Sequence, residues 1–154
     1  MIISTGLADA LAGAMPGQSL RKIFEYAVLG IYGGAIPADA DLAETGTLIG
    51  WLTVDSLPFV PGSPTNGLVW GPPAGGICPK SSSEIWSFVP LVTMEITWAR
   101  LYTNTVVTGY STVEKRIDYL CGAASGDLQF SVLLATQGQV RTIDLFDLGF
   151  SRFI

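Results

Sequence analysis

Residues 94–102, MEITWARLY, give the clearest indication of the fold class. Successive residues of a β-strand face opposite sides of their sheet. One side of this strand would carry Ile96, Trp98, Arg100 and Tyr102, and the other Thr97, Ala99 and Leu101. Both sides are largely apolar, which is typical of a strand that is covered on both faces. The stretch therefore predicts a central strand of a buried sheet.

Segments of the same kind surround this strand. Upstream, residues 27–32 and 47–54 are rich in β-branched and aromatic residues. From residue 84 onward, strand-like runs recur about every ten residues, at 85–89, 105–113, 116–122, 128–134, 140–146 and 148–154. Short strands at this spacing are typical of sandwiches and barrels. We expect residues 27–154 to form a mainly β domain, an antiparallel β-sandwich of the jelly-roll type.

The first 26 residues differ, because their pattern is helical. Ser4 or Thr5 can cap a helix in which an apolar residue recurs every four positions, at Leu7, Leu11 and Met15. Pro16 and Gly17 would end this helix, and a second short one can begin at Ser19. We expect residues 1–26 to be an N-terminal helical segment that packs on the sheet of its own domain. The alternative is an arm that docks on a neighbouring subunit.

The composition points to a folded protein with a neutral exterior. Hydrophobic residues make up 49% of the 154 residues, which excludes general disorder. Charged residues make up only 14%, against about 25% in an ordinary soluble domain. A surface poor in charge is often an interface, so the sequence favours an assembled protein over an evenly charged monomer.

Several function classes are excluded by what the sequence lacks. It has no histidine, so it can build neither a Ser-His-Asp nor a Cys-His site and offers no imidazole to a metal. The net charge is −5 and no basic patch occurs, so we expect no nucleic-acid partner. We predict no enzymatic activity and no cofactor.

The cysteines and the apolar runs exclude further classes. Cys78 and Cys121 stand 43 positions apart, which is neither a zinc nor a redox spacing, so we expect buried free thiols. The longest uncharged run, residues 56–79, contains six prolines and five glycines, which a membrane helix would not carry. The amino end has no basic region of the kind that begins a signal peptide. We expect no membrane segment.

Residues 56–83 form a long loop rich in proline, glycine and serine. Such a loop within a compact domain is usually functional or interfacial. Its apolar side chains must cover either the sheet of this domain or a neighbouring subunit. For the latter case, the candidate interface residues are Phe59, Leu68, Val69 and Trp70.

The acidic residues suggest structural roles more than catalysis. Asp39, Asp41 and Glu44 lie in one loop but lack the calcium-loop spacing, so we expect a solvated turn. Four aspartates could supply the paired carboxylates of a glycan hydrolase: Asp118, Asp127, Asp144 and Asp147. Arg100 needs a partner on an apolar strand, and Asp118 is the candidate.

The four tryptophans have two interpretations. Trp51, Trp70, Trp86 and Trp98 fit the core and subunit contacts of an aromatic-rich sandwich. They could instead line a groove for a sugar, as in a carbohydrate-binding module. We expect the core, and in particular the burial of Trp98 and Tyr102.

Two stretches carry a family resemblance. In residues 31–53, IYGGAIPADADLAETGTLIGWLT, an aromatic strand ends in a Tyr-Gly-Gly turn, and Thr-Gly-Thr-Leu opens the next strand. The matching residues are Tyr32, Gly34, Pro37, Ala40, Asp41, Thr45, Gly46, Thr47 and Leu48. Residues 96–104 and 115–146 supply a Trp-Ala-Arg-Leu strand, an Arg-Ile-Asp strand and a Gly-Asp-Leu turn. This order resembles small virion structural proteins of tailed bacteriophages, from which Gly33 and Cys121 depart.

The resemblance implies a structural role in a virion. We expect a capsid decoration (cement) protein that binds the major capsid protein on the capsid exterior and is assembled in the host cytoplasm. Self-association as a dimer or trimer is expected. The alternative is a neck, collar or tail-attached virion protein of the same fold.

Overall fold

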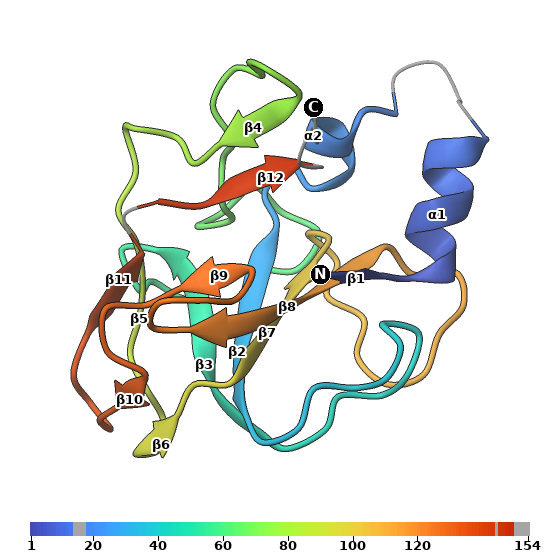
Figure 1. Cartoon of the computed structure of the whole chain (residues 1–154). Helices are drawn as coiled ribbons and strands as arrows, with labels where there is room; N and C mark the ends of the chain where they lie inside the picture. The colour runs from blue at the N-terminus through green and yellow to red at the C-terminus, as the bar shows by residue number, and fades with distance from the viewer. Residues whose placement is uncertain (14–17, 144, 150–154) are drawn as a thin grey trace.

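The computed structural model describes residues 1–13, 18–143 and 145–149 (Figure 1). The described chain is mainly β, its sheets are antiparallel apart from one short parallel pair, and a short helix lies near the N-terminus. The predicted fold class is confirmed at this level. The jelly-roll connectivity stays a prediction.

One large sheet dominates the molecule. Its strands lie in the order β1 (Ile2–Ile3), β8 (Arg116–Gly122), β7 (Trp98–Tyr102), β2 (Val28–Gly33), β3 (Thr47–Val54), β5 (Trp86–Phe88) and β11 (Arg141–Ile143). The short β9 (Leu128–Gln129) adds to β8 in parallel. Two small sheets pair β6 (Met94–Glu95) with β10 (Leu134–Ala135), and β4 (Ile77–Pro79) with β12 (Asp147–Gly149).

Strand β7 has the central position that its sequence predicts. It pairs with β2 on one side and β8 on the other, and all five of its residues are buried. The predicted burial of Trp98 and Tyr102 is thereby confirmed. The strand is shorter than MEITWARLY, because at Ile96 and Thr97 the backbone N–H groups donate to Leu133 and Tyr32 outside the β7 pairing.

The core lies between the large sheet and the segments that cover one of its faces. Figure 1 shows β4 and β12 side by side beyond one end of the sheet. An aromatic cluster includes Phe146, which precedes β12: Trp70 contacts Trp86 with ring centroids 5.0 Å apart, and Phe146 contacts Tyr119 at 5.2 Å. Offset and edge-on pairs of this kind are favourable beyond their burial.

The N-terminal segment is helical as predicted but is not separate from the sheet. The Ser4 side chain caps α1 (Thr5–Ala12) by accepting from the Leu7 N–H. The Ser19 side chain caps α2 (Leu20–Ile23) by accepting from the Lys22 N–H. Leu7 belongs to the core, and β1 pairs with β8. The segment therefore packs on its own domain, and residues 2–3 are part of the sheet. The predicted helix positions from Met15 to Gly17 lie outside the described residues.

Residues 105–113, predicted as a strand, form an irregular loop. Val106 and Gly109 have φ values of +48° and +83°, which no strand accommodates. Arg116 explains the difference, because its guanidinium binds the carbonyls of Val107 and Gly109 that a ladder would otherwise use. The predicted strands at 128–134 and 140–146 are also shorter than expected, and residues 150–154 lie outside the described part.

Candidate docking surface

A shallow apolar groove lies beside β3, where the chain enters the proline-rich loop. Its volume is about 340 Å³, and it is lined by Trp51, Thr53, Ser56, Leu57, Pro58, Phe59, Val89 and Leu91. Two segments that are distant in sequence form it, because the pairing of β3 with β5 places residues 89–91 next to residues 51–59. No charged side chain is among the lining residues.

A tight turn creates one wall of this groove. Asp55 and Ser56 have φ values of +53° and +58°, and the Leu57 N–H donates to the Val54 carbonyl at 3.0 Å. Positive φ at both central residues is the mark of a type I′ turn, which reverses the chain at the end of a twisted strand. Thr53 fixes the reversed segment, since its hydroxyl donates to the Leu57 carbonyl at 2.7 Å.

Two further contacts hold the wall against the floor. The ring of Phe59 packs edge-on against Trp51 with centroids 5.8 Å apart, and the Asn66 amide donates to the Pro58 carbonyl at 2.6 Å. The groove is therefore preformed, which lowers the entropy that binding must cost.

Apolar side chains extend the surface beyond the groove. Leu57 is 49% exposed and Leu91 61%, while Val60 and Ile85 on neighbouring segments are 49% and 60% exposed. Exposed apolar surface that gathers into a patch marks an interaction site, and the groove lining is such a patch. The chemistry available here is the burial of apolar surface, with hydroxyls of Thr53 and Ser56 as the polar groups of the lining.

The four candidate interface residues do not share one surface. Phe59 lines the groove and is half-buried, whereas Leu68 and Trp70 are fully buried in the core. Val69 is half-buried, and its N–H donates to the Glu84 carboxylate. Leu68 and Trp70 thus cover the sheet of their own domain, and the interface role of Phe59 and Val69 stays a prediction.

Sequence reasoning missed Trp51, Leu57, Val89 and Leu91 as groove residues. The motif LPFVP at residues 57–61 was a usable signal, because prolines flank apolar residues that a strand would otherwise bury. Nothing local indicates that residues 89–91 lie beside it.

The tryptophans offer little to a sugar. Trp70, Trp86 and Trp98 are 1%, 0% and 0% exposed, and only Trp51 is partly accessible. The expected assignment of tryptophans to the core is correct for these three. A carbohydrate site would have to rest on Trp51 in a groove that lacks the charged and amide groups usual for sugars.

The aspartates are not arranged as a catalytic pair with Asp118. That residue is fully buried and accepts from Arg100 Nε at 2.6 Å and Arg100 Nη2 at 2.7 Å, so the predicted pairing is confirmed. Asp127 pairs with the N-terminal amine and accepts from the Leu120 N–H. Asp147 lines a hollow with Asp127, and Asp144 lies outside the described residues.

The acidic loop is not the solvated turn that its sequence suggests. Asp39 is exposed, but Asp41 is buried and accepts from the N–H and hydroxyl of Thr5. Glu44 accepts from Arg100, Tyr102 and Gly109. Across residues 1–13, 18–143 and 145–149, no three acidic or cysteine side chains come together as metal ligands.

Electrostatics supports the ionised forms of Glu44 and Arg100, whereas burial raises the pKa of Asp118 in spite of its bonds to Arg100. Burial alone would raise the pKa of Glu44, but hydrogen bonds from Gly109 and Tyr102 and the Arg100 charge outweigh it, so its pKa is lowered. Burial alone would lower the pKa of Arg100, but its hydrogen bonds to Asp118 outweigh this effect, so its pKa is raised. Arg100 and Asp118 are inaccessible to a substrate, which makes the pair structural.

Both cysteines are free thiols, as predicted. Cys78 is buried and Cys121 half-buried. Burial raises the pKa of Cys78, and it raises the pKa of Cys121 to about 12. These thiols are therefore protonated at neutral pH, which disfavours nucleophilic chemistry.

No family model, no curated protein and no solved structure matches the chain. Neither described helix has the length and apolar character that a membrane span requires.

Proposed function

We propose that this chain is a non-catalytic structural subunit that docks on other proteins of a larger assembly through neutral apolar surface. The observation that carries the proposal is the preformed groove beside Trp51, whose lining is apolar and free of charged side chains. Burying such a surface is favourable without the desolvation of charges.

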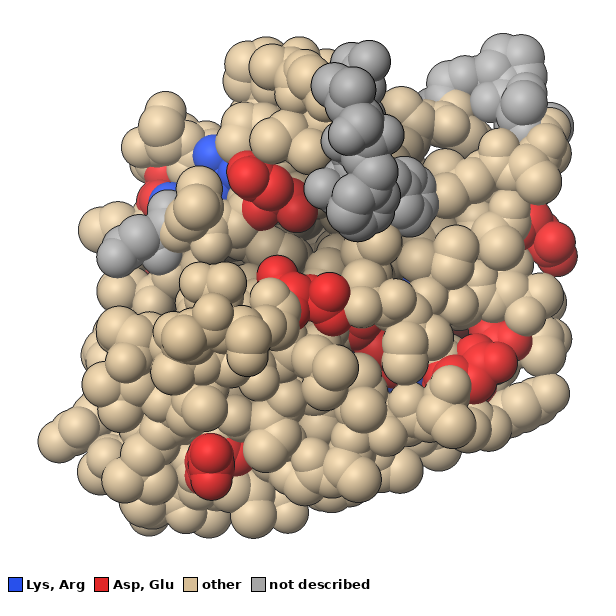
Figure 2. Space-filling view, in the orientation of Figure 1, with Lys and Arg blue, Asp and Glu red and all other residues tan. Residues whose placement is uncertain are grey.

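The rest of the exterior supports this proposal. Figure 2 shows a mostly neutral face on which charged side chains stand as isolated groups. Part of the small number of charges is also removed from the surface, because Arg100, Arg116 and Asp118 are buried. Fifteen large hydrophobic side chains of the described residues are at least 39% exposed, so apolar surface is also present outside the groove.

The resemblance of two stretches to virion proteins supports a narrower proposal for the kind of assembly. We propose a decoration (cement) protein on the exterior of a tailed-phage capsid, bound to the major capsid protein and self-associated as a symmetric dimer or trimer. A neck, collar or tail-attached position is the second form of this proposal. Copy number in purified particles separates the two, since cement covers the shell and a neck or tail part occupies one vertex.

The test replaces groove residues and measures incorporation. Purified particles that lack the protein are incubated with wild-type chain, with Leu57→Ser/Leu91→Ser and with Val140→Ser, a similarly exposed apolar position outside the groove lining. We expect the double variant to lose most of its binding and the control to retain it. Equal binding of all three proteins would reject the groove as the docking surface.

A further inference from the structure

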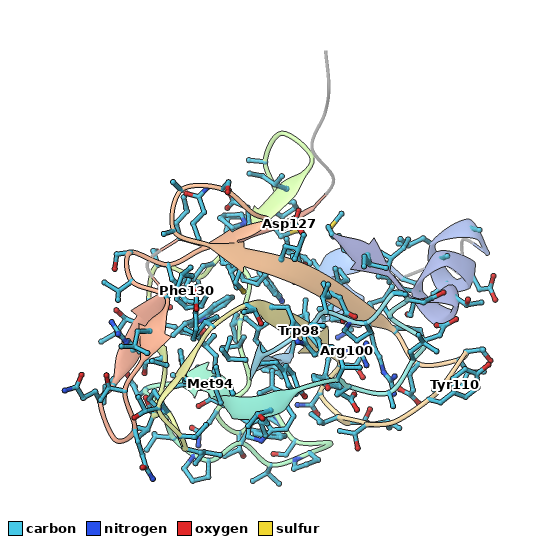
Figure 3. All side chains as sticks on the ribbon, turned by 60° about the horizontal axis from the view of Figure 1, so that its bottom comes forward. Met94, Trp98, Arg100, Tyr110, Asp127 and Phe130 are labelled. Carbon is cyan, nitrogen blue, oxygen red and sulfur yellow. The ribbon has the colours of Figure 1, made fainter. Side chains whose placement is uncertain are left out.

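The loop of residues 103–115 displays its apolar side chains outward. Val107, Tyr110 and Val113 are 41%, 70% and 73% exposed. Figure 3 shows Tyr110 at the outer end of this loop, far from Trp98 and Arg100 in the interior. Irregular backbone has no ladder to keep it in place, so specific contacts must hold the loop in this conformation.

Two charged side chains bind Gly109 from both ends of its backbone. Its N–H donates to Glu44 Oε2 at 2.9 Å, and its carbonyl accepts from Arg116 Nη1 at 2.6 Å. With φ at +83°, this residue has the left-handed conformation that glycine adopts without strain. The neighbour of Tyr110 is thereby fixed in position and direction.

Glu44 is in turn anchored on the sheet. Its Oε1 accepts from Arg100 Nη1 at 3.0 Å and from the Tyr102 hydroxyl at 2.7 Å. Arg100, Tyr102 and Gly109 all donate hydrogen bonds to Glu44. The side chain at position 44 must therefore accept on both of its terminal oxygens. A glutamine would turn its amide NH₂ toward one of the donors and leave that bond unmade.

The sheet does not depend on Glu44 in the same way. Arg100 keeps two hydrogen bonds to Asp118 and one to the Leu42 carbonyl, and β7 pairs with β8 through their backbones. Glu44 itself is half-buried and lies in the segment of chain that connects β2 to β3. We infer that Glu44 is a clasp: a positioning residue that holds loop 103–115 in its outward-facing conformation.

The clasp is tested by hydrogen–deuterium exchange on the full chain at neutral pH. In Glu44→Gln, amides of residues 103–115 should exchange about tenfold faster or more, because a charge-assisted bond is lost. Peptides from β2 and β7 should keep their wild-type rates. Asp55→Asn is the matched control, since it removes an exposed carboxylate at a positive φ that asparagine tolerates, and it should change neither region.

Two outcomes would overturn the inference. Unchanged exchange of residues 103–115 in Glu44→Gln would mean that other contacts hold the loop without Glu44, such as those of Arg116 and the bond from the Ser111 N–H to the Asp41 carbonyl. Equal acceleration of the loop and the sheet would make Glu44 a general stabiliser. Tyr102→Phe keeps the test valid if the glutamine variant fails to fold, because it removes one donor to Glu44 and should give a smaller acceleration in the same loop.

Discussion

Arg100 carries a permanent charge at a position with no access to water, and its surroundings explain how. Asp118 lies opposite Arg100 on β8 and accepts from it through both carboxylate oxygens. Arg100 Nη1 donates to Glu44 and to the Leu42 carbonyl. Such a site is stable when every donor is satisfied and costly when one partner is removed.

Removal of Asp118 should therefore be destabilising. We expect Asp118→Asn to lower the free energy of unfolding by about 3 kcal/mol, because a buried guanidinium loses its main counter-ion. Arg100→Met combined with it should cost less than the two single changes together, with a coupling of at least about 1 kcal/mol. Urea unfolding of the four proteins measures this, and additive losses would contradict the coupling.

Trp98 provides a second test at this scale. Its ring stacks on Tyr32 with centroids 4.3 Å apart and is fully buried. Trp98→Ala should lower the free energy of unfolding by about 3–5 kcal/mol, as expected for a large cavity. Trp51→Ala is the matched control and should cost clearly less, because that indole is partly exposed. Equal losses would show that the two sites are equally well packed.

At the scale of elements, the proline-rich loop is part of the core. Leu68 N–H donates to the Ala27 carbonyl at 2.8 Å, and the Trp70 indole N–H donates to the Phe24 carbonyl at 2.8 Å. The loop thus joins the start of β2 to the aromatic cluster. Its exposed residues lie near the groove and also at residues 72–76 and 82–83.

Substitutions at Leu68 and Val60 test the buried and the exposed part of the loop separately. Leu68→Ala should lower the free energy of unfolding by about 2–5 kcal/mol, since Leu68 is fully buried. Val60→Ala, at a position that is 49% exposed, should stay within about 0.5 kcal/mol of wild type. Denaturant unfolding of wild type and both variants measures these two changes in the free energy of unfolding. A stable Leu68→Ala variant would show that the loop is dispensable for the core.

The Glu44 clasp gives a pH dependence with a definite sign. Because the folded state lowers the pKa of Glu44, its contribution is fully present above the unfolded value of about 4.3 and is lost as the pH falls through the folded value. The difference in unfolding free energy between wild type and Glu44→Gln should be constant near neutral pH and shrink below about pH 4. A difference that grows on acidification would contradict this assignment.

Local pattern predicts some elements of this fold well and others poorly. The strand at residues 47–54 has the predicted bounds, because β-branched and aromatic residues there fit a buried sheet. Residues 105–113 have a similar composition but form a loop, since the buried Arg116 binds their carbonyls. The groove was not predictable either, because residues 89–91 reach Trp51 only through the β3–β5 pairing.

On the scale of the whole molecule, part of the charge is buried. Arg100 and Arg116 lie in the interior together with Asp41 and Asp118, so the fully buried charges of the described residues balance. The exterior keeps a small acidic excess from a total of −5. We therefore expect the proposed docking to rest on apolar area, with little contribution from long-range steering.

Docking through the groove should therefore be insensitive to salt. Charges on a surface are largely screened when ionic strength rises from about 0.05 M to about 0.5 M, whereas burial of apolar surface is not weakened. We expect the affinity for particles to change by less than about threefold over this range, because no lining residue is charged. The measurement is equilibrium binding to particles at several NaCl concentrations, with Asp55→Asn as a variant that lacks the carboxylate next to Ser56 in the wall of the groove. A tenfold or larger loss in salt would show that ion pairs, and not the groove, supply the contact.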